Sequence, residues 1–444
     1  MGPIAIGLLG LLALLVMLFL GMHIGVAMAL VGFFGMFYVS SIGFGTTFGL
    51  NAAIGLLKSM PYTQSATFAL SVIPMFVLMG QLCYESGISA DLYGACYKWL
   101  SRLKGGLSMA TVVACAGFAA ICGSSTATTA TMGIVCMPEM EKFNYKPTLS
   151  TGCISAGGTL GILIPPSTGF ILYGTSAEIG IGKLFMAGLL PGLLLAICYI
   201  AVIVVICMLD PEAGPKGPDF SFIEKLKGLT GVIPVILLFL LVLGGIYAGW
   251  FTPNEGGAIG AFGAFIIMIF KRKCTYTSVR NALSDTIKTT AMIFMIMIGA
   301  AIFSTFLTKS GAPRELANWA ANADVSRYVI LLFILLLYAF LGCFVDSLPL
   351  IVLLVPIFLP IIRELGFNDI WFGVLMVMIM QLGLITPPVG MCCYVMAGVA
   401  KNVPLSTIFK GTAPFIIGLV FAVTVVILLP QITTIIPDMM GSGG

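Results

Sequence analysis

Gly161-Ile162-Leu163-Ile164-Pro165-Pro166 is repeated almost unchanged as Gly383-Leu384-Ile385-Thr386-Pro387-Pro388, 222 residues further along the chain. Both stretches lie inside long apolar regions. A proline pair interrupts a helix because proline lacks the backbone N–H and restricts the residue before it. One such break would predict only a kink. A repeated break at membrane depth predicts a duplicated binding site.

The composition indicates a membrane protein. Of the 444 residues, 59% are hydrophobic and 9% are charged, and the mean hydropathy is +1.13. A soluble domain of this length carries many more charges, so we predict an all-α polytopic membrane protein. The first twenty residues have neither a basic start nor a small-residue cleavage site, which favours a retained span over a signal peptide.

Ten stretches are long and apolar enough to cross about 30 Å of hydrocarbon. They are 4–20, 23–41, 64–85, 148–178, 184–209, 229–249, 254–270, 288–308, 370–398 and 405–430. Two more apolar regions, 106–141 and 327–362, have polar residues at their middle, which predicts re-entrant hairpins. Segments 44–58 and 274–287 are amphipathic, and we expect them to lie along the membrane surface.

The basic residues orient this arrangement, because cytoplasmic loops carry an excess of Lys and Arg. Alternating the spans places fifteen basic residues on one side and six on the other. The six are Lys58, Lys183, Lys309, Arg314, Arg327 and Arg363. The richer side is therefore predicted to be cytoplasmic, and both termini are predicted to lie outside.

Other matches extend the repeat beyond the proline pairs. Ser125 and Pro138 match Ser347 and Pro360 at the same offset of 222. Further pairs match at 223, 224 and 231: Gly188 and Pro191 with Gly411 and Pro414, Ser86-Gly87 with Ser310-Gly311, and Gly25 and Gly32 with Gly256 and Gly263. In the predicted topology the two hairpins enter from opposite sides, so the halves are inverted repeats, as in many secondary transporters.

The proline pairs have a chemical consequence. They should free the carbonyls of Gly161, Ile162, Gly383 and Leu384, and such groups cannot face lipid. Sodium is a suitable partner, because a hard cation prefers oxygen ligands. A kink satisfied by neighbouring helices is the alternative for either copy taken alone. Asp346, at the middle of the second hairpin, is either a cation ligand or the N-cap of the helix that follows.

These motifs together resemble the large membrane subunit of the tripartite ATP-independent periplasmic (TRAP) transporters, over nearly the whole chain. The resemblance rests on 158–167, Leu184–Gly188, Phe251–Glu255, Gly383–Gly390 and Asp346-Ser347. It implies an elevator-type fold similar to that of divalent-anion/sodium symporters. It also implies sodium-coupled import of a small organic anion, such as a carboxylate or acidic sugar, across the bacterial inner membrane. The expected partners are a small four-span subunit and a periplasmic binding protein.

The resemblance also assigns the sites. It places sodium at Ser124, Ser125, Gly161, Ile164, Pro166, Asp346, Ser347, Gly383, Thr386 and Pro388. Thr386 stands where Ile164 stands, so the two cation sites need not be equivalent. The expected substrate contacts are Thr126, Thr128, Pro165, Ser167, Thr168 and Pro387.

We expect five parts along the chain. Residues 1–104 and 229–325 would form the scaffold, residues 105–209 and 326–438 would form the moving transport part, and residues 210–228 would be a cytoplasmic linker.

Other functions fit the sequence less well. A stand-alone sodium/dicarboxylate-type symporter is the main alternative. A channel or membrane scaffold would need a continuous polar pore, whereas the polar residues here gather at paired breaks. We expect no enzyme activity and no organic cofactor, because the single histidine lies in a turn and Asp346 has no carboxylate partner at the same depth. There is no Walker motif for ATP hydrolysis.

Overall fold

The computed structural model describes residues 2–42, 44–322 and 324–440. All regular elements in these residues are helical. The first half of the chain forms α1 (Pro3–Phe19), α2 (Ile24–Ser41), α3 (Thr46–Ser65), η1 (Phe68–Ser71), α4 (Val72–Glu85), α5 (Ile88–Leu100), α6 (Gly106–Cys122), α7 (Ser125–Lys142), α8 (Pro147–Thr159), η2 (Leu160–Ile162), α9 (Thr168–Ala177) and α10 (Ile181–Leu209).

The second half follows the short helix α11 (Phe222–Leu229). It forms α12 (Ile233–Tyr247), α13 (Pro253–Phe270), α14 (Tyr276–Ser310), α15 (Ala312–Ala321), α16 (Arg327–Gly342), α17 (Ser347–Glu364), α18 (Asp369–Ile385), α19 (Met391–Val399), α20 (Leu405–Leu428) and α21 (Gln431–Met439). Seven helical runs in the described residues are long and apolar enough to cross a membrane, and α11 with α12 would make an eighth despite a 47° bend.

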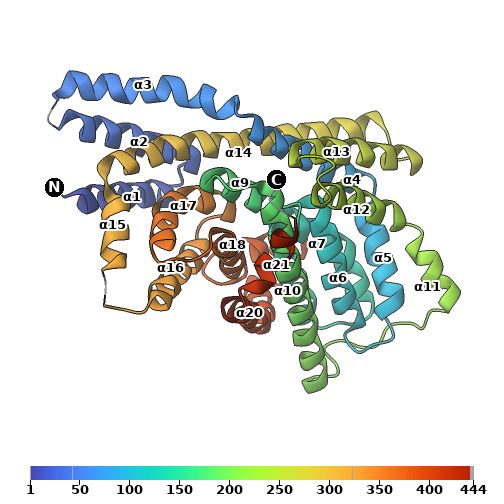
Figure 1. The fold of residues 1–444 in the computed structure, drawn as a ribbon. Helices are drawn as coiled ribbons and strands as arrows, with labels where there is room; N and C mark the ends of the chain where they lie inside the picture. The colour runs from blue at the N-terminus through green and yellow to red at the C-terminus, as the bar shows by residue number, and fades with distance from the viewer. Residues whose placement is uncertain (1, 43, 323, 441–444) are drawn as a thin grey trace.

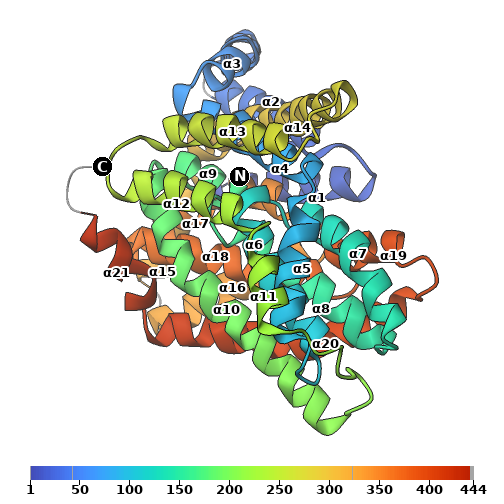
Figure 2. The same ribbon diagram turned by 90° about the vertical axis from the view of Figure 1, so that its right-hand side faces the viewer.

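The helices form two groups (Figure 1). Helices α2, α3, α4, α13 and α14, here called the long-helix layer, run along one edge of the molecule. Helices α6–α10 and α16–α20, here called the broken-helix bundle, lie beside it. Figure 2 shows the same separation from the side. The bundle holds both hairpins and both proline pairs, so the predicted site lies within one of the two groups.

The repeat is visible in the helix boundaries. Helix α7 and helix α17 begin and end exactly one repeat apart, at 125–142 and 347–364. The halves also pack crosswise, because α2 lies along α14 and α13 lies along α4. Gly25 makes the first crossing close, since a Cβ there would lie 2.6 Å from the carbonyl oxygen of Met295. The structure confirms an all-helical repeat fold with two hairpins.

Two corner residues of the repeat have matching geometry. Gly87 and Gly311 adopt φ angles of 75° and 78°, a region that glycine enters without a steric penalty. The serine before each one donates a 2.7 Å hydrogen bond to a carbonyl in the helix that ends there. The chain turns at these corners into α5 and α15, which leave opposite ends of the long-helix layer (Figure 1). The sequence analysis did not identify these two connecting helices.

One predicted boundary is wrong. Segment 274–287 was expected to be a surface helix separate from the span 288–308. The structure joins them into the continuous 35-residue helix α14. The physical reason is that no proline or glycine occurs between Tyr276 and Gly299 to end the helix. In the first half, the corresponding surface segment 44–58 forms the longer helix α3, which packs against α2.

Candidate functional site

Both proline pairs break their helices as predicted. In the first repeat the α-helical part ends at Thr159, and α9 begins at Thr168. In the second repeat α18 ends at Ile385, and α19 begins at Met391. The peptide bonds Pro165-Pro166 and Pro387-Pro388 are both cis. The two breaks therefore share a backbone geometry as well as a sequence.

The tip of the first hairpin is bonded to the first break. Thr168, at the start of α9, donates a 2.7 Å hydrogen bond from its hydroxyl to the carbonyl of Gly123. Ser125, at the start of α7, donates to the carbonyl of Thr159 at 3.3 Å. The structure therefore brings together hairpin and break residues that are about 35 to 45 positions apart in the sequence.

Gly161 is needed for this contact. A Cβ on Gly161 would lie 2.5 Å from the carbonyl oxygen of Ser124 and 2.7 Å from the hydroxyl oxygen of Thr128. These distances are too short for any side chain. Glycine thus lets the backbone of the break approach the oxygen atoms of the hairpin tip.

Two of the predicted free carbonyls accept hydrogen bonds. The Gly383 carbonyl accepts a 3.5 Å bond from the backbone N–H of Thr386. Ser167 caps α9 and also donates its hydroxyl proton to the carbonyl of Ile162. The prediction that the proline pair leaves the Ile162 carbonyl without a hydrogen bond is therefore wrong. Ser167 directly follows the proline pair and lies five residues after Ile162, so its hydroxyl supplies the donor that the prolines remove.

The second hairpin tip differs in detail. The carboxylate of Asp346 accepts a 2.7 Å hydrogen bond from the backbone N–H of Ser347, and Asp346 occupies the N-cap position of α17. This confirms the capping role that the sequence allowed and leaves its other oxygen for a ligand. The Ser347 hydroxyl is buried and has no hydrogen-bond partner in the part of the chain that the structure describes.

The second tip also touches its own break through glycine. A Cβ on Gly383 would lie 2.6 Å from the carbonyl oxygen of Gly342, at the end of α16. In the first repeat the tip contacts the break through Ser124, so the two contacts are not equivalent. Each hairpin nevertheless meets the proline break of its own repeat.

Thr386 in the second break and Ile164 at the matching position of the first break make different contacts. Thr386 donates from its hydroxyl to the carbonyl of Leu382 at 2.5 Å. Thr412 of α20 donates to the carbonyl of Ile385 at 3.0 Å. Ile164 instead packs into an apolar gap beside Gly192 of α10. Thr412 was missed by the sequence analysis, although a hydroxyl directly after Gly411 in an apolar span was a usable signal.

The predicted substrate hydroxyls are mostly engaged within the protein. Thr128 donates to the carbonyl of Ser124 at 2.7 Å, and Ser167 and Thr168 make the bonds described above. Thr126 is half-buried, and its hydroxyl oxygen lies 3.3 Å from that of Ser124. Thr126 is therefore the most open of these four groups.

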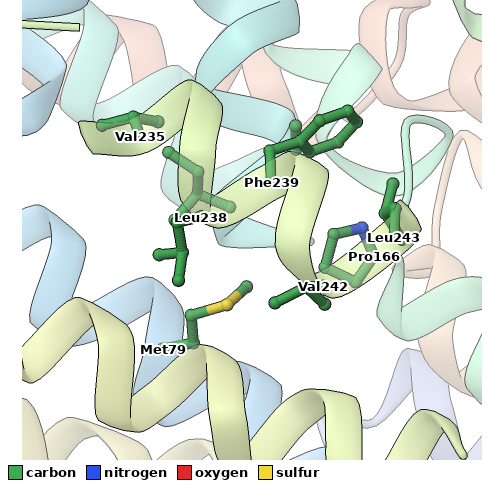
Figure 3. A pocket seen from close by; sticks show the side chains of 9 residues that line it. Met79, Pro166, Val235, Leu238, Phe239, Val242 and Leu243 are labelled. Carbon is green, nitrogen blue, oxygen red and sulfur yellow. The ribbon is translucent and has the colours of Figure 1, made fainter. Parts of the chain in front are cut away.

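The two proline pairs differ in exposure. Pro165 and Pro166 are buried, whereas Pro387 and Pro388 are exposed. Figure 3 shows Pro166 facing Met79 of α4 and Val242 and Leu243 of α12 across a small apolar gap. The first break is thus covered by neighbouring helices, and the second is open.

The short helix that follows each break packs against the other repeat. Helix α9 packs on α17, and α19 packs on α7. Of these four, α9 and α17 also lie against the long-helix layer. The main neighbours of α7 and α19 among the described residues are α8 and other bundle helices, and neither packs to a comparable extent on α4 or α14. One half of the bundle is therefore covered by the layer, and the other half is not.

A polar cavity lies where the layer covers the bundle. Its volume is about 260 Å³, and Ser304 of α14 lines it together with Pro356 of α17. The other polar lining residues are Gln64, Thr67, Thr175 and Ser176. Sequence patterns did not reveal this cavity, because its residues come from four distant segments.

The described residues contain no group of three or more His, Cys, Asp and Glu side chains that could hold a metal ion. The oxygen atoms at the two tips come instead from hydroxyls, backbone carbonyls and the single carboxylate of Asp346. Such a donor set suits a monovalent hard cation better than a transition metal.

Comparisons with known proteins agree with this architecture. Residues 11–432 match the family model described as the tripartite ATP-independent periplasmic transporter, DctM component. The C4-dicarboxylate TRAP transporter large permease protein DctM of Pseudomonas aeruginosa is 33% identical over 404 residues, which cover 88% of this chain and 94% of that protein. The sialic acid TRAP transporter large permease protein SiaM of Vibrio cholerae is 29% identical, over 95% of this chain and 96% of that protein.

A solved structure shares the fold. MtrF of Neisseria gonorrhoeae, described as illuminating a class of antimetabolite efflux pumps, superposes with a TM-score of 0.60 at 13% identity. The match covers 90% of this chain and 94% of that one. At this identity the likeness concerns the fold alone. The family match and the relatives establish a transporter and not an enzyme: the chain belongs to the large permease component of the tripartite ATP-independent periplasmic transporters.

Proposed function

We propose that the chain imports a small organic anion in symport with sodium ions and that its solute is delivered by a periplasmic binding protein. The observation that carries the proposal is the pairing of each hairpin tip with the proline break of its own repeat. Thr168 with Gly123 and Gly383 with Gly342 mark the two contacts. Each contact gathers oxygen atoms at a helix interruption, which is where secondary transporters coordinate ions.

The proposed cation ligands are the tip and break residues named from the sequence, without the Ile162 carbonyl. Asp346 makes the second site more negative than the first, where Ser124 stands at the same position. The buried hydroxyl of Ser347 has no hydrogen-bond partner among the described residues, and an unsatisfied buried polar group favours a ligand at this point.

The substrate is proposed to be a carboxylate. The tip and break segments contain no Lys or Arg. Its charge would therefore be met by the N-termini of α7 and α9, which carry partial positive charge, and by open hydroxyls such as Thr126. The relatives named for C4-dicarboxylates and sialic acid transport anions of this class, which supports the proposal.

The transport movement is proposed to be an elevator, with the broken-helix bundle moving against the long-helix layer. The long-helix layer covers only one half of the bundle, which supports this movement. Since α9 and α17 pack more extensively on the layer than α7 and α19 do, a shift of the bundle would exchange the covered half for the open half. With the fifteen basic residues inside, the open half faces the cytoplasm and both termini lie in the periplasm.

The decisive experiment is uptake into proteoliposomes that contain the chain with its small membrane subunit. A radiolabelled carboxylate would be supplied with and without the periplasmic binding protein, and with an inward sodium or potassium gradient. We expect uptake only with the binding protein, the small subunit and sodium together. Uptake by this chain alone would favour a stand-alone symporter. Non-saturating conductance without sodium dependence would rule out the proposal.

A further inference from the structure

A strongly basic corner lies away from the proline breaks. It consists of the end of α5 with its loop (residues 91–104), the linker and α11 (residues 216–231) and the end of α13 (residues 267–273). These segments contain nine of the 21 Lys and Arg residues and three acidic residues. The corner therefore carries a net charge of +6 in a chain whose net charge is +4. The nine are Lys98, Arg102, Lys104, Lys216, Lys225, Lys227, Lys271, Arg272 and Lys273.

Tertiary contacts hold the three segments together. Lys271 pairs with Asp91 of α5, and Arg102 pairs with Asp219 at 3.3 Å. Helix α11 packs on α5. Gly228 lies so close to Lys98 that a Cβ there would be 3.0 Å from the lysine Cδ. Residues up to 182 positions apart thus form one surface.

The acidic residues of the corner are already engaged. Asp91 and Asp219 belong to the two ion pairs, and the Glu224 carboxylate accepts a 2.8 Å hydrogen bond from the N–H of Ser221 in a capping box. Seven basic side chains remain outside any ion pair between the described residues. Five of them, Lys104, Lys216, Lys227, Arg272 and Lys273, are exposed.

An exposed apolar face borders these charges. Phe222, Ile223 and Leu226 of α11 are 69%, 65% and 55% exposed. Trp99 of α5 is 43% exposed, and its ring centroid lies 6.4 Å from that of Phe222. A short helix with one apolar face and flanking lysines is typical of segments that lie in the membrane interface. Tryptophan is enriched at the same depth.

The position of the basic corner in the fold agrees with a place in the membrane interface. Helix α11 leads through a 47° bend into the apolar helix α12, and the basic run 271–273 follows directly after the span α13. The start of α12 and the end of α13 therefore both lie at the membrane boundary, at the basic corner. A soluble anion would make no use of the apolar face, whereas a phospholipid has both an anionic headgroup and acyl chains.

We propose that this corner binds an anionic phospholipid, with the headgroup phosphate among Lys98, Lys225 and Lys227 and the acyl chains against the apolar face of α11. The bound lipid would anchor α5, the helix that links the long-helix layer to the first hairpin. This inference concerns lipid binding alone and does not depend on sodium coupling or on the solute.

The test uses the purified complex of the chain with its small subunit. Bound lipid would be measured by native mass spectrometry after exchange into mixtures of phosphatidylethanolamine with either phosphatidylglycerol or phosphatidylcholine. We expect retained phosphatidylglycerol in preference to phosphatidylcholine. The triple variant Lys98→Gln, Lys225→Gln, Lys227→Gln should lose this preference by about tenfold or more, because each basic residue near the surface contributes about 1 kcal/mol.

The matched control carries Lys58→Gln, Lys183→Gln and Arg314→Gln, three basic residues outside the corner. It should retain phosphatidylglycerol as the unmodified protein does. Thermal unfolding and gel filtration verify that both triple variants are folded. A second variant, Ile223→Ser, should weaken retention of lipid without changing charge. Equal retention by the two triple variants, or equal retention of the two lipids by the unmodified protein, would overturn the proposal. Phosphatidylglycerol binding that appears only after removal of the small subunit would assign the surface to that subunit.

Discussion

Gly152 of α8 lies directly against Gly411 of α20, with the helix backbones in contact. A Cβ on either residue would overlap a backbone carbonyl of the other helix. This crossing joins the first repeat to the second inside the broken-helix bundle. Small residues allow such close approach in membranes, where packing drives helix association.

We therefore predict that Gly152→Ala or Gly411→Ala destabilises the protein by about 1–3 kcal/mol, because the helices must separate to admit the methyl group. Thermal unfolding of the purified protein in detergent would measure the loss. Gly244→Ala is the control, since a Cβ at that helical position has open space around it. An unchanged unfolding temperature in the two bundle variants would contradict the close packing.

The bond between Thr168 and Gly123 predicts a role for a single hydroxyl. Thr168→Val keeps the shape of the side chain and removes the donor, which leaves the Gly123 carbonyl with the weaker 3.4 Å bond from the Thr168 N–H. The loss of one hydrogen bond, about 0.5–1.5 kcal/mol, should loosen the hairpin tip and lower the maximal uptake rate. Thr168→Ser should behave like the unmodified protein. Equal uptake by the Val and Ser variants would show that the bond is dispensable.

The two roles considered for Asp346, cation ligand and helix cap, can be separated by substitution. Asp346→Asn removes the charge but keeps an oxygen that can accept from the N–H of Ser347. If Asp346 is a sodium ligand, the sodium concentration for half-maximal uptake should rise about tenfold or more, with little change in thermal stability. Uptake measured against sodium concentration decides this. A normal sodium response in the Asn variant, with lower stability in Asp346→Ala, would leave Asp346 as a cap alone.

The ion pair of Lys146 with Asp210 predicts a dependence of stability on pH. The two side chains meet at 2.5 Å between the α7–α8 turn and the end of α10. The hydrogen bond between them lowers the pKa of Asp210 and raises the pKa of Lys146. The contribution of Asp210 is present above its unfolded pKa, near 4, and is lost as the pH falls through the lower folded value. The contribution of Lys146 is lost as the pH rises through its raised folded value.

The pair should thus stabilise the protein between about pH 5 and pH 10. In Asp210→Asn the decline of the unfolding temperature below pH 5 should be shallower than in the unmodified protein. Glu364→Gln removes an exposed carboxylate that forms no ion pair with the described residues and serves as the control. Parallel pH profiles for the unmodified protein and Asp210→Asn would mean that the pair does not contribute. Since both groups are solvent-accessible, salt should weaken the effect.

Several features of the fold were predictable because they depend on local backbone chemistry. Each proline pair ends its helix whatever surrounds it. The offset of 222 between Ser125 and Ser347 equals the offset between the proline pairs and so indicates the repeat. Thr252 and Glu255 form a capping box at the start of α13, which depends only on residues three positions apart. The fusion into α14 was missed because hydropathy does not distinguish a surface segment from the first turns of a span.

The sequence by itself determined the membrane class, the duplication and the helix breaks, because composition and proline act through neighbouring residues. Only the tertiary structure decided that Thr168 reaches the Gly123 carbonyl, that Thr412 reaches the Ile385 carbonyl and that the second proline pair is open while the first is covered. Each of these depends on which distant helix lies within hydrogen-bond or van der Waals distance. That is set by packing between helices that are distant in the sequence, which the order of residues along one helix does not encode.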